Sequence, residues 1–343
     1  MASLNSLVEV DSIEFAVIVD NEVDPISPVV HPGVQYKGRL PEVKLSPIPP
    51  GQGRGGALAE IPMHATAVKG DVRHTLLFDT GPTEDSFEAN AKRLPIDLAM
   101  VERIHLSHWH RDHSGGMLRA IRMIQDAKAK SAPTANKVVV DLHPDRPDFR
   151  GFALAPDKIF SLEADPSFDE MSNAGAEVAT NAAAHTVLDD MFLISGSIPR
   201  VTEYEGGLRA AMRYESSTGQ WRSDELISDE RLVMCNLKGK YDEGLVVFTG
   251  CSHAGVVNVS KHAVELGGSA PLYAVIGGYH LADATPEKMQ SSADDLKKLS
   301  PQVMIPGHCT GWRFKQLLEQ QMPGSLVPCF VGARFTLSSV IEA

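Results

Sequence analysis

The sequence predicts a mixed α/β domain, because short apolar runs typical of strands alternate with helix-compatible segments along most of its 343 residues. In the C-terminal third, a strand, a glycine-containing loop and a helix follow one another three times. Near the N-terminus, two strand-like runs flank Lys69-Gly70-Asp71, which is typical of an antiparallel hairpin. Parallel and antiparallel strands should therefore occur together. No repeat and no break in composition divides the chain, which predicts a single domain over residues 1–343.

The individual elements follow from apolar periodicity and turn residues. A helix should begin near Met117, since Met117, Ile121 and Ile124 recur at helical spacing. Another should begin after Thr285, a favourable N-cap residue that is followed by proline. Strands are expected over residues 13–19, 65–68, 74–78, 101–106, 137–142, 191–194, 245–249, 272–276 and 303–305, and a further helix over 86–94.

Two segments should depart from this regular pattern. Residues from about 22 to 56 are rich in proline and glycine, which predicts a long surface loop inserted into the domain. Residues from about 129 to 190 are largely polar outside their short apolar runs and are expected to be a variable segment.

The charge balance limits the partners. Asp and Glu number 44 against 32 Lys and Arg, a formal net charge of −12 at pH 7. Nucleic acids and anionic membranes attract basic surfaces, so neither is expected as a partner. A small-molecule substrate is the expected ligand, and the oligomeric state is left open.

The compartment is predicted from the N-terminus and the cysteines. Glu9, Asp11 and Glu14 stand where a secretory signal would be apolar, and every apolar run is far shorter than the roughly 20 residues that cross a bilayer. Four scattered cysteines do not suggest a disulfide framework. A cytoplasmic protein is therefore expected.

The strongest chemical signal is a cluster of metal-binding side chains directly after the predicted strand at 101–106. His108, His110, Asp112 and His113 form an H-x-H-x-D-H pattern, followed by two glycines. A loop is needed here, because an extended strand would direct neighbouring side chains to opposite faces. Imidazoles and a carboxylate suit Zn²⁺, Fe or Mn better than Ca²⁺.

Other strand ends should complete this site. His253 and His308 each follow an apolar strand through a glycine-containing turn, and both are candidate ligands. Cys251 and His280 have the same setting; Cys251 is a tentative ligand, with a buried inert thiol as the alternative. Asp79, at the end of the second hairpin strand, is expected to hydrogen-bond a ligand imidazole and fix its tautomer.

These motifs resemble the metallo-β-lactamase superfamily of metallohydrolases. The resemblance rests on HLSHWHRDHSGG, preceded by LLFDTGP and followed by IPGHCTG. The phrases VVFTGCSHAGVVNV, VIGGYHL and ISGSIPRVTEYE are similar to a branch related to the archaeal dihydropterin ribofuranosylaminobenzene phosphate synthase. The match extends over most of the chain, from residue 18 to residue 332.

The resemblance implies a four-layer αββα sandwich of two mixed sheets flanked by helices, with a dinuclear site at one edge. It implies that His108 and His110 hold one metal, and that Asp112, His113 and His308 hold the other. The family's bridging carboxylate is replaced here by Cys251, and its separate histidine by a serine turn, for which His253 is the expected substitute. One or two Zn²⁺ ions per chain are expected, with Fe or Mn as alternatives.

The predicted function is a hydrolase whose metal-bound hydroxide attacks an ester, thioester, lactone, amide or phosphoester. Asp112 is the expected proton carrier and His280 the expected stabiliser of the developing oxyanion. The alternatives are a C–N bond-forming transferase like the pterin-pathway relative, a mononuclear-iron thiol oxidoreductase, and a metal-bound binding protein without turnover.

Three further residues receive a structural interpretation. Arg200 either binds an anionic substrate or makes a structural salt bridge. Asp224 and Glu230 are expected on a solvated face, with a carboxylate pair as the alternative.

Overall fold

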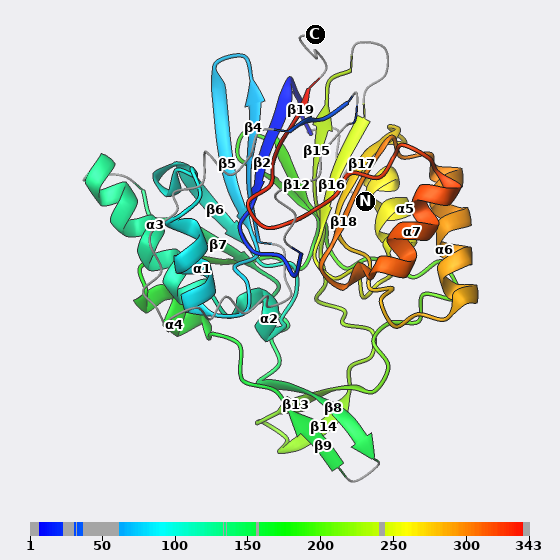
Figure 1. Ribbon diagram of the computed structural model, residues 1–343. Coiled ribbons are helices and arrows are strands. Elements are labelled where there is room, and N and C mark those ends of the chain that lie inside the picture. Colours follow the sequence, from blue (N-terminus) through cyan, green and yellow to red (C-terminus); the bar gives the residue numbers. More distant parts are fainter. Residues whose placement is uncertain are drawn as a thin grey trace, which may run out of the picture.

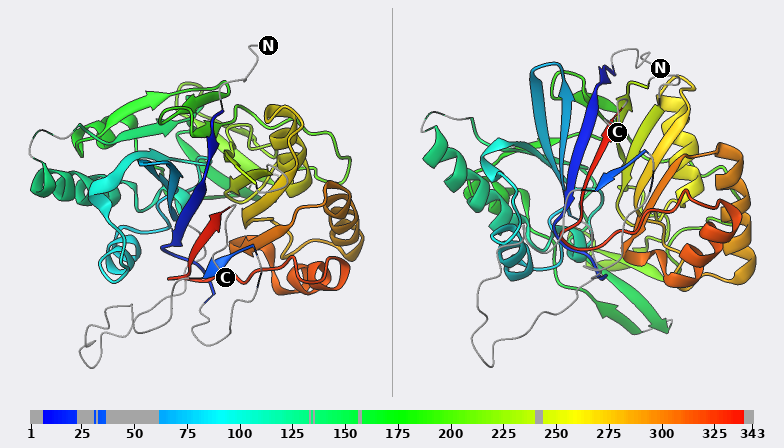
Figure 2. Two further views of the ribbon diagram at one scale, coloured as in Figure 1. Left: turned by 90° about the horizontal axis from the view of Figure 1, so that it is seen from above. Right: turned by 45° about the horizontal axis from the view of Figure 1, so that its top comes forward.

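The computed structural model describes residues 7–22, 31, 33–36, 62–132, 134, 136–155, 158–239 and 244–338. Two β-sheets pack face to face, and helices cover the outer face of each, so that four layers run across the molecule (Figure 1). The view from above separates the two groups of helices on opposite sides of the paired sheets (Figure 2). The fold class predicted from the sequence is confirmed.

The larger sheet contains eight strands among the described residues. In spatial order they are β10 (Glu177–Thr180), β7 (Val139–Leu142), β6 (Val101–His105), β5 (Val72–Phe78), β4 (Met63–Lys69), β2 (Ser12–Val17), β19 (Arg334–Ser338) and β3 (Gln35–Tyr36). The strands from β10 to β5 are parallel, and those from β5 to β3 are antiparallel. The predicted hairpin is confirmed, since β4 pairs antiparallel with β5.

The second sheet contains seven strands among the described residues. They are β11 (His185–Val187), β12 (Phe192–Ile194), β15 (Val233–Leu237), β16 (Gly244–Thr249), β17 (Leu272–Gly278) and β18 (Val303–Gly307), with β1 (Glu9–Val10) paired to β15. Strands β16, β17 and β18 are parallel, as their separation by helices requires.

The helices bury one apolar face each against a sheet. The larger sheet is covered by α1 (Glu84–Ala91), α3 (Met117–Ser131) and α4 (Phe168–Asn173), and the second by α5 (Val256–Leu266), α6 (Pro286–Leu299) and α7 (Trp312–Gln321). On α3 the predicted stripe of Met117, Ile121 and Ile124 is fully buried. Thr285 caps α6, since its hydroxyl accepts from the backbone N–H of Lys288. Short helical segments are η2 (Leu98–Met100), α2 (Arg111–Ser114) and η3 (His308–Thr310).

The core between the sheets consists of apolar side chains from both inner faces. Phe15 belongs to this core, and its ring centroid lies 5.6 Å from that of Phe248 and 5.0 Å from that of Phe335. This core fixes the two sheets relative to one another. The carboxyl ends of β5, β6, β16, β17 and β18 consequently meet along one edge of the sandwich, next to α2 (Figure 1).

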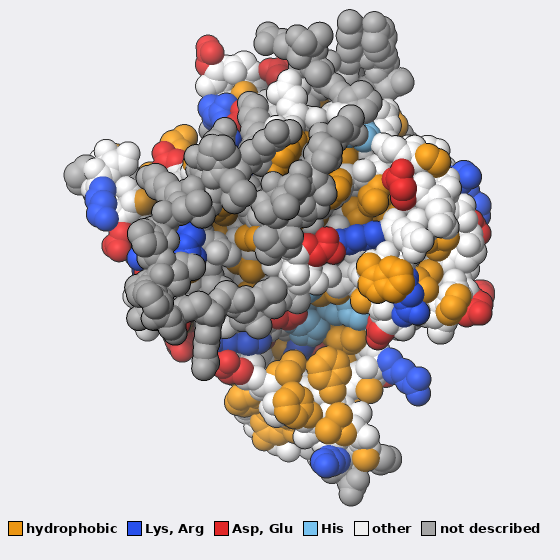
Figure 3. Space-filling view, in the orientation of Figure 1, with side chains coloured by type: hydrophobic (Ala, Val, Ile, Leu, Met, Phe, Trp, Pro, Cys, Tyr) orange, Lys and Arg blue, Asp and Glu red, His pale blue; other side chains and the backbone are white. Residues whose placement is uncertain are grey.

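A small third sheet extends from this same edge. It consists of β14 (Gln220–Ser223), β13 (Ala211–Glu215), β8 (Phe149–Ala155) and β9 (Lys158–Ser161), all antiparallel. Leu154 is 64% exposed and Phe160 56% exposed on it. Figure 3 shows hydrophobic side chains gathered over this sheet, directly below a group of histidines.

The expected loop at 22–56 lies mostly outside the described residues. Of that segment the structure describes residues 22, 31 and 33–36, which include the short strand β3. In the expected variable segment at 129–190 the structure has four-residue strands such as β7 and β10 as well as α4. Within the described part of the chain, every helix is too short or too polar to span a membrane.

Candidate metal centre

The histidine-rich loop is folded by the end of β6 and the short helix α2. His108 lies in the bend that follows β6, and His110, with extended backbone dihedrals, is the N-cap of α2. Asp112 and His113 lie on the single turn of α2, which returns the chain toward His108. The glycines after α2 are required by space, because a Cβ at Gly116 would lie 2.1 Å from the carbonyl oxygen of Thr80.

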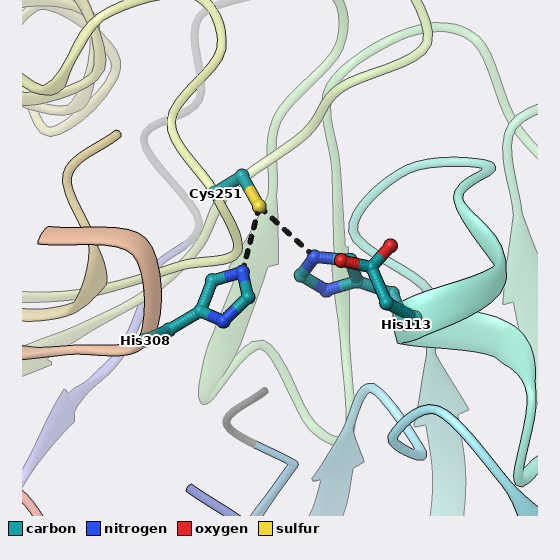
Figure 4. A group of neighbouring side chains, drawn as sticks. His113, Cys251 and His308 are labelled. Carbon is teal, nitrogen blue, oxygen red and sulfur yellow. Dashed lines mark hydrogen bonds between the residues drawn. The ribbon is translucent and has the colours of Figure 1, made fainter. Parts of the chain in front are cut away.

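One group of candidate ligands surrounds the thiol of Cys251. Cys251 Sγ lies 2.9 Å from His308 Nε2 and 3.1 Å from His113 Nε2, as drawn in Figure 4. A carboxylate oxygen of Asp112 joins them, and all four ligand atoms lie within 4.8 Å of one another. His113, Cys251 and His308 are each less than 5% exposed.

A second group of candidate ligands contains the same thiol. Ligand atoms of His108, His253 and Cys251 also lie within 4.8 Å of one another. His110 adjoins this group, since its Nδ1 lies 2.9 Å from His108 Nε2 and 3.2 Å from His253 Nε2. The structure therefore brings together all the predicted ligands and puts Cys251 between two groups, at the position where the superfamily is expected to carry a bridging carboxylate.

Asp79 lies directly behind these side chains. It is 1% exposed, and its Oδ2 accepts from His113 Nδ1 at 2.7 Å and from the Ser107 hydroxyl at 2.8 Å. The other oxygen, Oδ1, accepts the backbone N–H of Ser107 at 2.7 Å. This arrangement directs His113 Nε2 toward Cys251, the orientation that a metal-binding imidazole requires.

The backbone at the strand ends adopts unusual conformations. Asp79, Ser252, His280 and His308 all have φ between 47° and 59°, in the left-handed region that non-glycine residues seldom occupy. Such conformations persist only where surrounding contacts enforce them, and they concentrate at functional sites. Here they turn the chain sharply enough to direct successive side chains into one small space.

Gly250 allows the strand end of β16 to approach the loop. A Cβ at this position would lie 2.4 Å from Ser107 Oγ and 3.3 Å from His113 Cε1. Any larger residue would displace the serine that hydrogen-bonds Asp79. The glycine before Cys251 is therefore needed for the two groups to meet.

Burial and the Asp79 carboxylate together determine the pKa values of the imidazoles. It lowers the pKa of His108, His110 and His253 well below the usual value, so these rings are neutral at pH 7. Burial alone would lower the pKa of His113 as well, but the Asp79 carboxylate raises it to about 9. Burial raises the pKa of the Cys251 thiol well above its usual value. These pKa shifts describe the side chains with no metal bound to them.

His280 lies at the margin of this cluster. Its ring centroid is 4.5 Å from that of His253, and the side chain is partly exposed. The structure thus brings His280 next to the predicted ligands but on the side that solvent reaches.

Buried carboxylates that sequence reasoning missed hold the loop after β16. Glu230 accepts the backbone N–H of His253 at 2.7 Å and that of Ala254 at 2.6 Å, and Glu205 accepts those of Val257 and Asn258 at the start of α5. The prediction of a solvated face for Glu230 and Asp224 is wrong. Glu230 is 1% exposed, and the Asp224 side chain is 9% exposed beside Arg150.

Arg200 and Asp20 support two of the candidate ligands from behind. Arg200 donates to the carbonyl oxygen of His253 at 2.9 Å, which favours the structural interpretation of this residue. Asp20, 3% exposed, accepts the backbone N–H of His308 at 3.3 Å, and burial raises its pKa to about 6. No sequence spacing could have revealed these contacts, because each joins residues far apart in the chain.

The donor set fits a zinc-like ion. Two nitrogens bound to one Zn²⁺ at roughly 2.1 Å with tetrahedral angles lie about 3.4 Å apart. The nitrogen–nitrogen distances around His110, 2.9 and 3.2 Å, are close to this value. Imidazole, thiolate and carboxylate are all ligands of Zn²⁺. The residues present therefore form a candidate metal site with His, Cys and Asp donors.

The chain has the metallo-β-lactamase fold. A solved structure described as a metal-dependent hydrolase of the β-lactamase superfamily superposes with a TM-score of 0.62 at 20% identity, covering 94% of this chain and 98% of that one. At this identity the likeness establishes the fold. No family model matches the sequence.

The chain is also a distant relative of an archaeal synthase. It is 25% identical over 257 residues to 7,8-dihydropterin-6-methyl-4-(β-D-ribofuranosyl)-aminobenzene-5′-phosphate synthase of Methanocaldococcus jannaschii, covering 73% of this chain and 80% of the synthase. An uncharacterised protein of the same organism is 25% identical over 245 residues, covering 71% and 82% of the two chains.

Proposed function

We propose that this protein is a metal-dependent hydrolase of uncharged carbonyl substrates such as esters, thioesters and lactones. The observation that carries the proposal is the sharing of Cys251 by two groups of candidate ligands, which favours a dinuclear centre. Two bound Zn²⁺ ions would supply a hydroxide at neutral pH and polarise the substrate carbonyl.

The protein's own residues prepare this site in three ways. The neutral rings of His108, His110 and His253 present lone pairs without first losing a proton at pH 7. Asp79 holds the imidazole of His113 in the orientation that directs Nε2 at the centre. We assign proton transfer to Asp112 and, on the solvent side, stabilisation of the developing oxyanion to His280.

The arginines near the site support an uncharged substrate. Arg111 pairs with Glu163, Arg150 with Asp229, and Arg213 with Asp145. Arg146 and Arg200 donate to backbone carbonyl oxygens. Because these guanidinium groups already have partners within the protein, they are poorly suited to bind a phosphate. The exposed Leu154 and Phe160 on the adjoining sheet favour an apolar substituent instead.

The distant synthase favours a second candidate, formation of a C–N bond. The name of that synthase denotes a phosphorylated product, whose binding calls for cationic groups. The engaged arginines argue against that chemistry here. The assay should nevertheless include a phosphorylated aromatic amine as a test substrate.

The test begins with metal content. Protein purified without added metal is analysed by mass spectrometry, and we expect about two zinc ions per chain. About one iron per chain would instead favour the thiol oxidoreductase. The same preparation is then assayed on nitrophenyl esters, thioesters, lactones and phosphomonoesters.

The decisive comparison is between two histidine variants. His110→Ala should lower hydrolysis at least a hundredfold, because it removes a nitrogen that faces two other candidate ligands. His262→Ala is the matched control, since His262 lies on α5 and contacts Glu265 instead. A loss below tenfold in His110→Ala, or equal losses in both variants, would contradict the proposal.

A further inference from the structure

A second cysteine lies against the shared thiol. Cys309, on η3 directly after His308, donates its thiol to the backbone carbonyl oxygen of Cys251 at 3.5 Å. The thiol of Cys309 therefore lies beside the backbone of the residue that carries the shared sulfur. Residue 278 must be glycine for this contact, because a Cβ there would lie 2.8 Å from Cys309 Sγ.

The two cysteines differ in their access to solvent. Cys251 is 3% exposed, whereas Cys309 is only partly buried. A small oxidant therefore reaches Cys309 first. The two remaining cysteines, Cys235 and Cys329, are fully buried in the core between the sheets and serve as internal references.

We propose that Cys309 and Cys251 form a site of oxidative modification, at which a hydroperoxide closes a disulfide that withdraws the shared thiol from the metal centre. The inference rests on the metal centre of the proposed function. It goes beyond that function by giving the centre a reversible means of inactivation.

The chemistry balances with a hydroperoxide as the oxidant. Cys309 Sγ attacks one oxygen of hydrogen peroxide, the O–O bond breaks, and Cys309 becomes a sulfenic acid while water leaves. Cys251 Sγ then attacks the Cys309 sulfur, the S–O bond breaks, and hydroxide leaves. Hydroxide takes its proton from the Cys251 thiol, or from solvent where zinc has held the thiolate. Two thiols and one peroxide thus give one disulfide and two waters.

The consequence for the metals follows from the position of Cys251. Its sulfur belongs to both ligand groups, so one disulfide removes a donor from each. The remaining donors of one group are Asp112, His113 and His308, and those of the other are His108, His253 and the adjoining His110. Each ion would lose its thiolate, and we expect zinc to be released to a competing chelator.

The experiment follows three readouts on the zinc-loaded full chain. Hydrogen peroxide is added in the presence of a colorimetric zinc chelator, and released zinc, free thiols and cysteine-linked peptides are measured together. We expect wild-type protein to lose two thiols per chain, to yield a peptide linking Cys251 to Cys309, and to release zinc. A dithiol reductant should restore both thiols and zinc binding.

Two variants distinguish oxidation of the Cys251–Cys309 pair from oxidation elsewhere in the protein. Cys309→Ser keeps the size and a hydrogen-bonding group, and it should bind zinc normally but release it at least tenfold more slowly under peroxide. Cys235→Ala alters a buried cysteine outside the pair and should behave as wild type. Equal rates of zinc release from wild type and Cys309→Ser, or the absence of the linked peptide, would overturn the proposal.

The same design distinguishes the two proposals from one another. If the chain binds no zinc, the proposed function fails, and peptide mapping of the peroxide-treated protein still tests the cysteine pair. If the chain binds zinc and hydrolyses esters but forms no linked peptide, the hydrolase stands and the redox pair falls.

Discussion

At the scale of single residues, the site depends on a few atoms whose partners fix their orientation. His113 illustrates this, because its Nδ1 is bound to Asp79 at 2.7 Å and its Nε2 faces Cys251 at 3.1 Å. The sequence alone predicted that these residues belong to one site. It could not predict that Cys251 lies between two ligand groups, because a buried inert thiol has the same local pattern.

Cys251→Ala should lower the zinc content from about two ions per chain to one or none, because each ligand group loses its shared sulfur. Cys251→Asp should restore binding, since a carboxylate can also bridge two ions. Metal content after dialysis, with Cys235→Ala as the control, measures the effect. An unchanged content in Cys251→Ala would show that the thiol is not a ligand.

Asp79→Asn should weaken zinc binding roughly 10–100-fold, the usual cost of losing a carboxylate that orients a metal-binding imidazole. Asparagine tolerates the positive φ of 56° at this position, so the fold should be retained. The affinity is measured by competition with a zinc chelator, and circular dichroism checks the fold. Wild-type affinity in a folded variant would contradict the assigned role.

At the scale of elements, five strand ends supply the site, and buried charges hold the loops that follow them. The parallel strands β16, β17 and β18 were predictable because each is a short apolar run before a glycine-containing loop. The small sheet of β8, β9, β13 and β14 was not predicted. Three of its strands have only four or five residues, and the side chains of all four are partly exposed, so the sheet lacks the regular alternation of apolar and polar residues that marks a half-buried strand.

The buried supports were equally invisible in the sequence. Glu230 lies 23 residues before the backbone N–H of His253 that it accepts, and Asp20 lies 288 residues from His308. Such contacts join side chains to distant backbone groups, so they leave no pattern of spacing. A candidate ligand can be found from its neighbours in sequence, whereas its support becomes visible only in the fold.

Glu230→Gln should destabilise the metal-free protein by about 1–3 kcal/mol, because one of the two backbone N–H groups of His253 and Ala254 loses its charged acceptor in a buried setting. Urea unfolding measures this change. Glu163→Gln is the control, since the Glu163 side chain is 74% exposed in its pair with Arg111 and should change stability by less than about 0.5 kcal/mol. Equal effects would argue against Glu230 as a support.

At the scale of the whole molecule, stability depends on acidic groups that the fold encloses. Burial raises the pKa of Asp165 to about 6, and the Ser114 hydroxyl, beside His113, donates to its carboxyl group. A carboxyl whose pKa is raised by folding binds more protons in the folded than in the unfolded state between its two pKa values. Its contribution to stability is therefore present at about pH 4 and is lost as the pH rises through 6.

Asp165→Asn should remove this part of the pH dependence, because the amide is neutral at every pH. The free energy of unfolding of the metal-free variant should fall less than that of wild type between pH 4 and pH 7, by up to about 3 kcal/mol. Urea titrations at several pH values measure it. Asp126→Asn, on the exposed face of α3, is the control and should retain the wild-type slope. An identical slope in Asp165→Asn would contradict this account.

The left-handed residues at the strand ends affect how the protein acquires its metal. Because surrounding contacts hold the backbone of Asp79, Ser252, His280 and His308 in these conformations, we expect the donor side chains to stay together when no ion is bound. Small zinc domains, by contrast, fold only when the ion binds. We therefore expect the newly made chain to fold first and to bind its metal afterwards, and the circular dichroism spectrum of the metal-free protein tests this. The ion that it then carries depends on which metals its surroundings supply. Cells that contain different metals would therefore load the same chain with different ions.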